Sequence, residues 1–378
     1  MRWLLGALIC LWAGAAVAQP ARLQAVAGLG QDAVTVSGLS SGAFFAHQFH
    51  VAFSRLVEGA GLVAGGPYGC AEPPDEPWWL AIHPYGRTLT ALSVCTRVAR
   101  GTVEGWADWW GGALPEAPTV ERAITVTDVT RAGAGIDDPA NLADDRVWLF
   151  HGTRDTVVPT ATGAVLAEYY RRAGVTGDRL AVVDNVSAGH GFPVDEFRGE
   201  SRFRKLTCAE QAPPFVVDCD RDAAGELIRH LLPDGFADSP VEPRRERLIG
   251  FDQREFFDAA ADSASLADIG YAYVPVACDT AAAGCRLHVA LHGCSQNAEA
   301  VDDDFVWDAG YNRWAEANRI VVLYPQTRAW SSPWDAFGWG GNPQGCWDWW
   351  GYSGEAYAER GGVQMQAVRT MIARLRAE

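Results

Sequence analysis

Short apolar runs alternate along the chain with longer stretches in which apolar positions recur every three or four residues. The runs are rich in β-branched residues and leucine without strict alternation, which is typical of parallel strands buried on both faces. We therefore expect strands over 33–36, 61–64, 147–150, 180–183, 287–291 and 320–324, and helices over 41–54, 160–173, 305–317 and 362–377. This order predicts an α/β fold with a mostly parallel, doubly wound sheet.

The ends and the middle of this pattern predict the domain organisation. Residues 1–18 have the features of a secretory signal peptide, because Arg2 precedes an apolar stretch that ends in the cleavage pattern Ala16-Val17-Ala18. That stretch is shorter than the ~20 residues a membrane span needs. We expect 19–378 to form a single α/β domain. Residues 195–250 interrupt the pattern with several prolines and two cysteines, and we interpret them as an insertion or connecting segment.

The net charge limits the kinds of partner that we expect, and the cysteine count indicates the cellular compartment. The formal net charge of −16 argues against nucleic acid or an anionic membrane as partner. Of nine cysteines, Cys10 falls in the signal, and an exported protein pairs the remaining even number as disulfides. Neighbour pairing, one of 105 possible connectivities, gives Cys70–Cys95, Cys208–Cys219, Cys278–Cys285 and Cys294–Cys346. These spacings do not match zinc ligands, so we expect no metal site.

A G-x-S-x-G sequence, Gly38-Leu39-Ser40-Ser41-Gly42, lies between the first predicted strand and the first predicted helix. A strand, this turn and a helix together form a nucleophile elbow, which raises the serine hydroxyl above the sheet. A turn this tight favours glycine at its flanks. We therefore expect Ser40 to be a catalytic nucleophile, and the alternative is an ordinary strand-to-helix turn with an idle serine.

A nucleophilic serine needs a base and a group that orients the base. Asp155 follows the predicted strand 147–150, and His190 lies on a glycine-flanked loop after the predicted strand 180–183. The carboxyl ends of parallel strands meet at one edge of the sheet, where ligands of α/β proteins bind. The order Ser, Asp, His is that of α/β-hydrolases. We expect His190 to be the general base and Asp155 its orienting acid; the alternative for Asp155 is a helix cap.

The oxyanion of an acyl-transfer intermediate needs two N–H donors. The elbow supplies the Ser41 amide, and the second donor usually comes from a loop that precedes the nucleophile in the chain. Too few residues precede Ser40 for that loop, whereas the apolar run 287–291 ends in His292-Gly293-Cys294. We therefore assign the Cys294 amide as second donor and predict a circularly permuted α/β-hydrolase. The alternative for this corner is a strand-end turn tied by a disulfide.

Tryptophans are unusually frequent in this chain, which has sixteen. Three of them fall within four residues of a Pro/Gly-rich loop, and others are expected in loops or near turns: Trp78, Trp79, Trp106, Trp109, Trp110, Trp330 and Trp334. Such a composition favours an aromatic cleft or an adsorbing face. We expect Trp347 and Trp349 to bind substrate; the alternative is core packing beneath a disulfide.

These motifs together resemble those of secreted polyhydroxybutyrate depolymerases, in particular the single-domain, circularly permuted type. The resemblance rests on residues 38–43, 64–70, 291–296, 310–315, 323–326 and 342–349, and covers about residues 30 to 355. It implies hydrolysis of poly(3-hydroxybutyrate) esters to short hydroxyacid oligomers. It implies the same roles for Ser40, Asp155 and His190, an oxyanion hole of the Ser41 and Cys294 amides, and a crevice lined by Trp349. Phe44-Phe45 and residues 193–247 do not match the family pattern.

The predicted activity is serine-esterase hydrolysis through an acyl-enzyme, without metal or organic cofactor. Two alternatives stay open: a secreted feruloyl or acetyl-xylan esterase on the same scaffold, and a non-catalytic, aromatic-rich polymer-binding protein. The signal predicts export to the periplasm or the medium without distinguishing them. No integral membrane association is expected, and the sequence does not indicate an oligomeric state.

Overall fold

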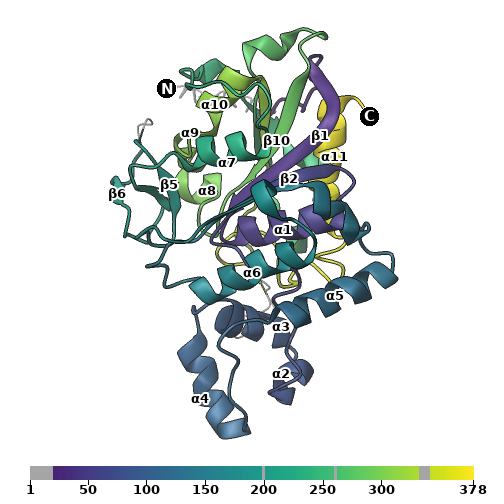
Figure 1. Ribbon diagram of the computed structural model, residues 1–378, viewed down its shortest axis with the longest axis vertical. Coiled ribbons are helices and arrows are strands. Elements are labelled where there is room, and N and C mark those ends of the chain that lie inside the picture. Colours follow the sequence, from purple (N-terminus) through teal and green to yellow (C-terminus); the bar gives the residue numbers. More distant parts are fainter. Residues whose placement is uncertain (1–19, 198–200, 259–261, 332–340) are drawn as a thin grey trace, which may run out of the picture.

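The computed structural model describes residues 20–197, 201–258, 262–331 and 341–378 (Figure 1). The predicted signal peptide at 1–18 and Trp334 lie outside these residues. Within them, no helix is long and apolar enough to cross a membrane.

An eight-stranded sheet forms the centre of the molecule. Its strands, in spatial order, are β4 (Leu180–Val183), β3 (Arg146–Phe150), β2 (Val57–Val63), β1 (Leu29–Leu39), β10 (Cys285–Leu291), β11 (Ile320–Tyr324), β9 (Ile269–Tyr273) and β8 (Leu248–Asp252). The strands from β4 to β11 are parallel, and β9 and β8 pair antiparallel at one edge. Each predicted strand is present, whereas β8 and β9 were missed because both are glycine-containing and only partly buried.

The strand order confirms the circular permutation. β1 carries the elbow, and its neighbour β10 comes from the last third of the chain, with Gly38 opposite Leu291. In an unpermuted α/β-hydrolase, the strand before the oxyanion loop precedes the nucleophile strand in sequence. Here β8 to β11 follow it and complete the sheet beyond β1. The fold is thus a circularly permuted α/β-hydrolase fold.

Helices cover both faces of the sheet (Figure 1). One apolar core lies between the sheet and α1 (Ser41–Ala52), α6 (Thr160–Arg172) and α11 (Val363–Arg376). A second core lies on the other face beneath α7 (Ala223–Leu231), α9 (Asp304–Asp308) and α10 (Tyr311–Asn318). α5 (Val120–Ala132) packs beside α6, and α8 (Ala298–Val301) precedes α9. Both faces of the parallel strands are therefore buried, as their apolar runs predict.

The predicted helix over 305–317 is two helices. Gly310 has a φ of 87°, in the left-handed region, and separates α9 from α10. A right-handed helix cannot continue through such a residue, and glycine adopts this conformation without a Cβ clash. The change of direction brings α10 against β11.

A helical arm, residues 71–119, leaves the sheet between β2 and α5. It consists of α2 (Trp78–Ile82), α3 (Gly86–Thr90), a π-helical turn (Ala91–Cys95) and α4 (Arg100–Trp110). In Figure 1 it projects below the rest of the molecule. The arm has a small apolar core of its own. Of its tryptophans, which were expected in loops or near turns, Trp78 and Trp79 begin α2, Trp109 and Trp110 end α4, and Trp106 lies within α4.

Four disulfides confirm the predicted pairing. They join Cys70 to Cys95, Cys208 to Cys219, Cys278 to Cys285 and Cys294 to Cys346. The first ties the base of the helical arm to the chain after β2. The second lies within residues 195–250, which contribute α7, lead into β8 and hold β6 (Leu206–Thr207) and β7 (Val216–Asp218). β5 (Phe192–Val194) joins these two strands in a small parallel sheet.

Candidate active site

Ser40 lies at the sharp turn between β1 and α1. Its φ of 54° and ψ of −122° place a non-glycine residue in the left-handed half of conformational space, a strained geometry that is typical of a nucleophile elbow. Two backbone contacts hold it there: the Ser40 amide donates to the Val63 carbonyl at 2.9 Å, and its carbonyl accepts from the Ala43 amide at 2.8 Å. Ser40 retains 8% exposure.

The elbow glycines are required by close approach. A Cβ on Gly38 would lie 2.4 Å from the backbone of Gly42, so the strand and helix could not meet at this angle. A Cβ on Gly42 would lie 2.4 Å from the carbonyl oxygens of Leu291 and His292. The end of β10 is therefore pressed against the first turn of α1, which brings the loop after β10 beside Ser40.

Asp155 and His190 form a buried hydrogen-bonded pair. His190 Nδ1 lies 2.7 Å from Asp155 Oδ2. Asp155 Oδ1 accepts from the amides of Val157 at 2.8 Å and Val158 at 2.9 Å, which fixes the carboxylate. An ionised carboxylate at Nδ1 keeps the proton on that nitrogen and leaves Nε2 as the basic position.

The electrostatics of this pair favour an ionised Asp155. Burial by itself would raise its pKa, but the charge and hydrogen bond of His190 outweigh burial, and the pKa lies below its ordinary value. Beside them, His151 Nε2 lies 2.8 Å from the Val158 carbonyl, and burial lowers the pKa of His151. His151 therefore holds the turn that follows Asp155 through the Val158 carbonyl.

A cavity of about 300 Å³ opens at this sheet edge. Its lining brings together residues from distant parts of the chain: Ser40, His190, Phe215, Cys294, Trp349 and Trp350. Most of the wall surface is apolar, and Phe44, Leu92 and Val157 are among its other lining residues. A nucleophile and its base thus face one apolar space, as an ester substrate with little charge would require.

The loop after β10 runs along the cavity beside the nucleophile. A Cβ on Gly293 would lie 3.5 Å from the Ser40 Cβ. The Gly293 amide donates to Gln296 Oε1 at 2.7 Å, and Gln296 Nε2 donates to the Pro214 carbonyl at 2.8 Å. Buried Gln296 therefore joins this loop to the turn that carries Phe215, whose ring lies edge-on to His190.

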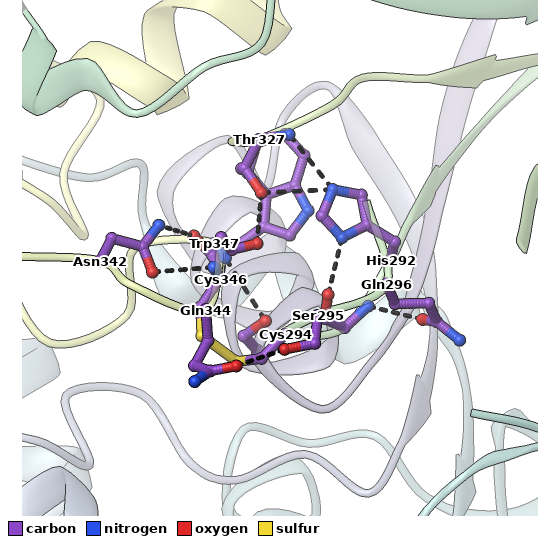
Figure 2. Close-up of a disulfide and its surroundings, with 12 residues drawn as sticks. His292, Cys294, Ser295, Gln296, Thr327, Asn342, Gln344, Cys346 and Trp347 are labelled. Carbon is purple, nitrogen blue, oxygen red and sulfur yellow. Dashed lines mark hydrogen bonds between the residues drawn. A yellow bond between two sulfur atoms is a disulfide. The ribbon is translucent and has the colours of Figure 1, made fainter. Parts of the chain in front are cut away.

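His292 orients the peptide that carries the proposed second donor (Figure 2). The Thr327 amide approaches His292 Nε2 at 3.2 Å, which leaves the proton on Nδ1, 2.7 Å from the Gly293 carbonyl oxygen. In a trans peptide the carbonyl and the following N–H point in opposite directions. Because the Gly293 carbonyl faces His292, the Cys294 N–H points away from His292. No role was expected for His292 or Gln296, although both lie in the run 291–296.

The Cys294–Cys346 disulfide joins this loop to the tryptophan loop (Figure 2). A second tie is the bond from the Ser295 amide to the Gln344 carbonyl at 2.6 Å. Trp349 lines the cavity and stacks on Phe44, with ring centroids 4.1 Å apart. Trp347 does not line the cavity, because its side chain is fully buried and packs against Phe45 in the core between the sheet and α1. Trp347 thus lies in the core, which is the alternative that the sequence left open, and not at the cavity where substrate binding was expected.

Asp348, between these tryptophans, organises the loop. Its Oδ1 accepts from the amides of Trp350, Gly351 and Tyr352, and its Oδ2 accepts from the amide and hydroxyl of Ser353. Burial raises the pKa of Asp348, and these hydrogen bonds offset part of the rise. No sequence signal singled out this carboxylate, which holds the backbone on the C-terminal side of Trp349.

Comparison with known proteins identifies the family. The chain is 30% identical over 346 residues to the polyhydroxybutyrate depolymerase of Talaromyces funiculosus, and the match covers 89% of this chain and 87% of the fungal protein. The chain belongs to the polyhydroxybutyrate depolymerase family. It is also 35% identical over 344 residues to the poly(3-hydroxybutyrate) depolymerase of Delftia acidovorans, covering 90% of this chain. It spans 59% of the length of that relative.

Solved depolymerase structures share the fold. The structure of the enzyme from Penicillium funiculosum matches with a TM-score of 0.74, and that of a serine-to-alanine PHB depolymerase in complex with an R3HB trimer with 0.72. Each is 26% identical in sequence and covers 94% of this chain and 99% of the solved chain. No family model matches the chain. The depolymerase likeness therefore extends over nearly the whole of this α/β-hydrolase.

Proposed function

We propose that this protein is a serine esterase that hydrolyses poly(3-hydroxybutyrate), or a related polyhydroxyalkanoate, to short hydroxyacid oligomers. The observation that carries the proposal is the arrangement of Ser40 and the His190–Asp155 pair at one apolar cavity. Membership of the depolymerase family supports the polyester as substrate. An uncharged ester chain also suits a cavity whose wall surface is mostly apolar.

In the proposed mechanism, Ser40 Oγ attacks the ester carbonyl carbon while His190 Nε2 takes its proton. The Ser41 and Cys294 amides stabilise the oxyanion. The C–O bond to the alcohol fragment then breaks, and this fragment leaves with the proton from His190. A water molecule gives a proton to His190 and attacks the acyl-enzyme, and Ser40 departs with that proton. The products are one hydroxyl-ended and one carboxyl-ended fragment.

We further propose that residues 19–378 act as one catalytic domain and that the protein is exported after removal of residues 1–18. Four disulfides support an oxidising compartment. N-terminal sequencing of the protein recovered outside the cytoplasm is expected to begin at Gln19; recovery only from the cytoplasm with Met1 retained would contradict export.

Product analysis with and without Ser40 tests the proposed activity. Wild-type protein is expected to clear a poly(3-hydroxybutyrate) suspension and release oligomers, and Ser40→Ala to lose about 10⁴-fold or more of this activity. Arabinoxylan carrying ferulate or acetyl groups serves as the competing substrate. Faster release from arabinoxylan than from the polyester would contradict the substrate, and full turnover by Ser40→Ala would contradict the mechanism.

A further inference from the structure

The helical arm exposes large aromatic side chains to an unusual degree. Trp109 is 86% exposed, Trp110 63% and Trp78 52%. Elsewhere among the described residues, the strongly exposed large hydrophobic side chains are single aliphatic residues on separate elements: Val129, Val182, Val241, Ile249 and Val276. Exposed indoles gathered in one arm of a protein are the kind of feature that marks an interaction site.

These tryptophans are not needed to hold the arm together. α4 already has a buried face, formed by Val103 and Ala107, which packs on Trp79 and Leu80 in the arm core. Its first turn is fixed by Arg100, which donates to the carbonyls of Ser93 at 3.0 Å and Pro115 at 2.8 Å. A helix with a satisfied apolar face normally presents polar residues on its other side. Trp109 and Trp110 depart from that pattern.

The helix ends that carry the three exposed indoles lie close together in the arm. α4 ends at Trp110, and Gly112 comes two residues later in the chain. Gly112 packs against Pro77, since a Cβ on Gly112 would lie 2.8 Å from the Pro77 Cβ. Pro77 immediately precedes Trp78, the first residue of α2. We call Trp78, Trp109 and Trp110 the arm tip. The tip is therefore formed by the neighbouring ends of two helices.

The other end of the arm is part of the active-site cavity. Thr88, Leu92 and Val98 line that cavity, and Val98 is also 64% exposed, which places it at the rim. α4 begins two residues after Val98. At a rise of 1.5 Å per residue, Trp109 lies about 14 Å along the helix from its start. The tip and the cavity rim are therefore separated by about the length of α4.

We propose that the arm tip adsorbs to the surface of solid polyester and holds it near the cavity. This inference rests on the proposed function and adds to it a second contact for the same substrate. A polyester surface is apolar and uncharged, and it carries ester carbonyls that an indole N–H can reach while its ring packs on the hydrocarbon. The net charge of −16 disfavours an anionic lipid surface as the occupant.

Adsorption is measured apart from hydrolysis in the Ser40→Ala background, by depletion of protein from suspensions of poly(3-hydroxybutyrate) granules. Trp109→Ser with Trp110→Ser is expected to lower the partition coefficient about tenfold. The matched control is Val129→Ser, which removes a 68% exposed apolar side chain from α5, and it is expected to adsorb like the parent. Trp109→Leu with Trp110→Leu keeps an apolar tip and is expected to restore most adsorption.

The same tip variants with Ser40 intact complete the test. Granule hydrolysis is expected to fall about tenfold, whereas hydrolysis of soluble p-nitrophenyl butanoate stays within twofold of wild type. Unchanged adsorption would overturn the inference, as would an equal loss on both substrates. Two further results would also overturn it. One is a dimer of the parent protein that dissociates when the tip is substituted. The other is tip-dependent binding to neutral lipid vesicles or arabinoxylan without binding to granules. No granule hydrolysis by wild type, with intact soluble-ester turnover, would instead contradict the proposed function.

Discussion

The sheet edge and the helical arm meet at one cavity but are built in opposite ways. At the edge, Ser40, Asp155 and His190 are 8%, 9% and 5% exposed, and the backbone around them is fixed by hydrogen bonds and close glycine contacts. In the arm, a small separate core supports a helix whose last turn exposes Trp109 almost fully. The edge positions a few polar atoms, whereas the arm offers apolar area.

This difference separates two tasks. Bond cleavage depends on a few atoms held within tenths of an ångström, and it should respond in the same way to every ester. Contact with a solid depends on area and tolerates displacement, and it should affect only the insoluble substrate. Changes at the edge and changes in the arm should therefore have different signatures, which the following predictions exploit.

The largest effect is expected for Asp155→Asn. An amide at this position no longer holds the Nδ1–H tautomer of His190, so kcat should fall about 10⁴-fold on both soluble ester and granules. The measurement is kcat for each substrate, with circular dichroism to show that the variant is folded. A loss of activity on granules alone would contradict the comparison, because that is the effect expected for residues of the arm and not for residues of the catalytic sheet edge.

Acid should destabilise the sheet region through its buried histidines. Burial lowers the pKa of His288 to about 3 and of His292 to about 4, and burial beside His50 lowers that of His47 well below its ordinary value. Below pH 6.5 the unfolded chain therefore binds protons that the folded chain does not, and stability falls with pH down to about 4. The expected loss is about 1.4 kcal/mol per pH unit for each histidine. Urea unfolding at pH 7.0 and 5.5 measures it; equal unfolding free energies would contradict it.

Two disulfides distinguish the regions further. Cys294→Ser with Cys346→Ser opens a link between residues 52 apart that ties the oxyanion loop to the tryptophan loop. We expect a loss of about 2–4 kcal/mol in unfolding free energy and a lower kcat on both substrates. Cys70→Ser with Cys95→Ser opens a link of 25 residues at the base of the arm, so its stability loss and its effect on soluble ester should be smaller. The reverse ranking would count against the assignment of the two regions.

Single glycines should give the smallest effects, with opposite signs. Gly42→Ala places a methyl group 2.4 Å from two backbone oxygens of the β10 end, and we expect a loss of about 1–3 kcal/mol. Gly105→Ala lies within α4 with no atom within 4 Å of the new Cβ, and we expect a gain of about 0.5–1 kcal/mol from helix propensity. Urea denaturation of both variants measures the two changes, and shifts of the same sign would show that the arm is as closely packed as the edge.

Periodicity predicted the parallel strands because their apolar runs are buried on both faces. It missed β8 and β9, whose residues are mixed and partly exposed. α7 carried a usable signal, since Asp222 caps it by accepting from the Gly225 amide at 2.9 Å. The arm helices α2 and α3 are only five residues each, too short for a 3.6-residue period to be recognised.

At the site, chain order was enough to select Ser40, Asp155, His190 and Cys294, because parallel strands deliver their carboxyl ends to one edge. The local residue pattern could not show which tryptophan faces the cavity, since Trp347 and Trp349 differ only in the direction of a loop fixed by Asp348; only the family resemblance singled out Trp349. His292 and Gln296 both contact Gly293, but the partners that complete their supporting roles lie more than 30 residues away. No local pattern encodes such contacts.

The most direct test of the central claim is a crystal structure of the protein after reaction with an alkyl p-nitrophenyl phosphonate, which mimics the tetrahedral intermediate. The account predicts a single bond from phosphorus to Ser40 Oγ, with the phosphoryl oxygen about 2.7–3.1 Å from the amide nitrogens of both Ser41 and Cys294. Phosphorus on another residue, or a phosphoryl oxygen turned away from the Cys294 amide, would contradict it.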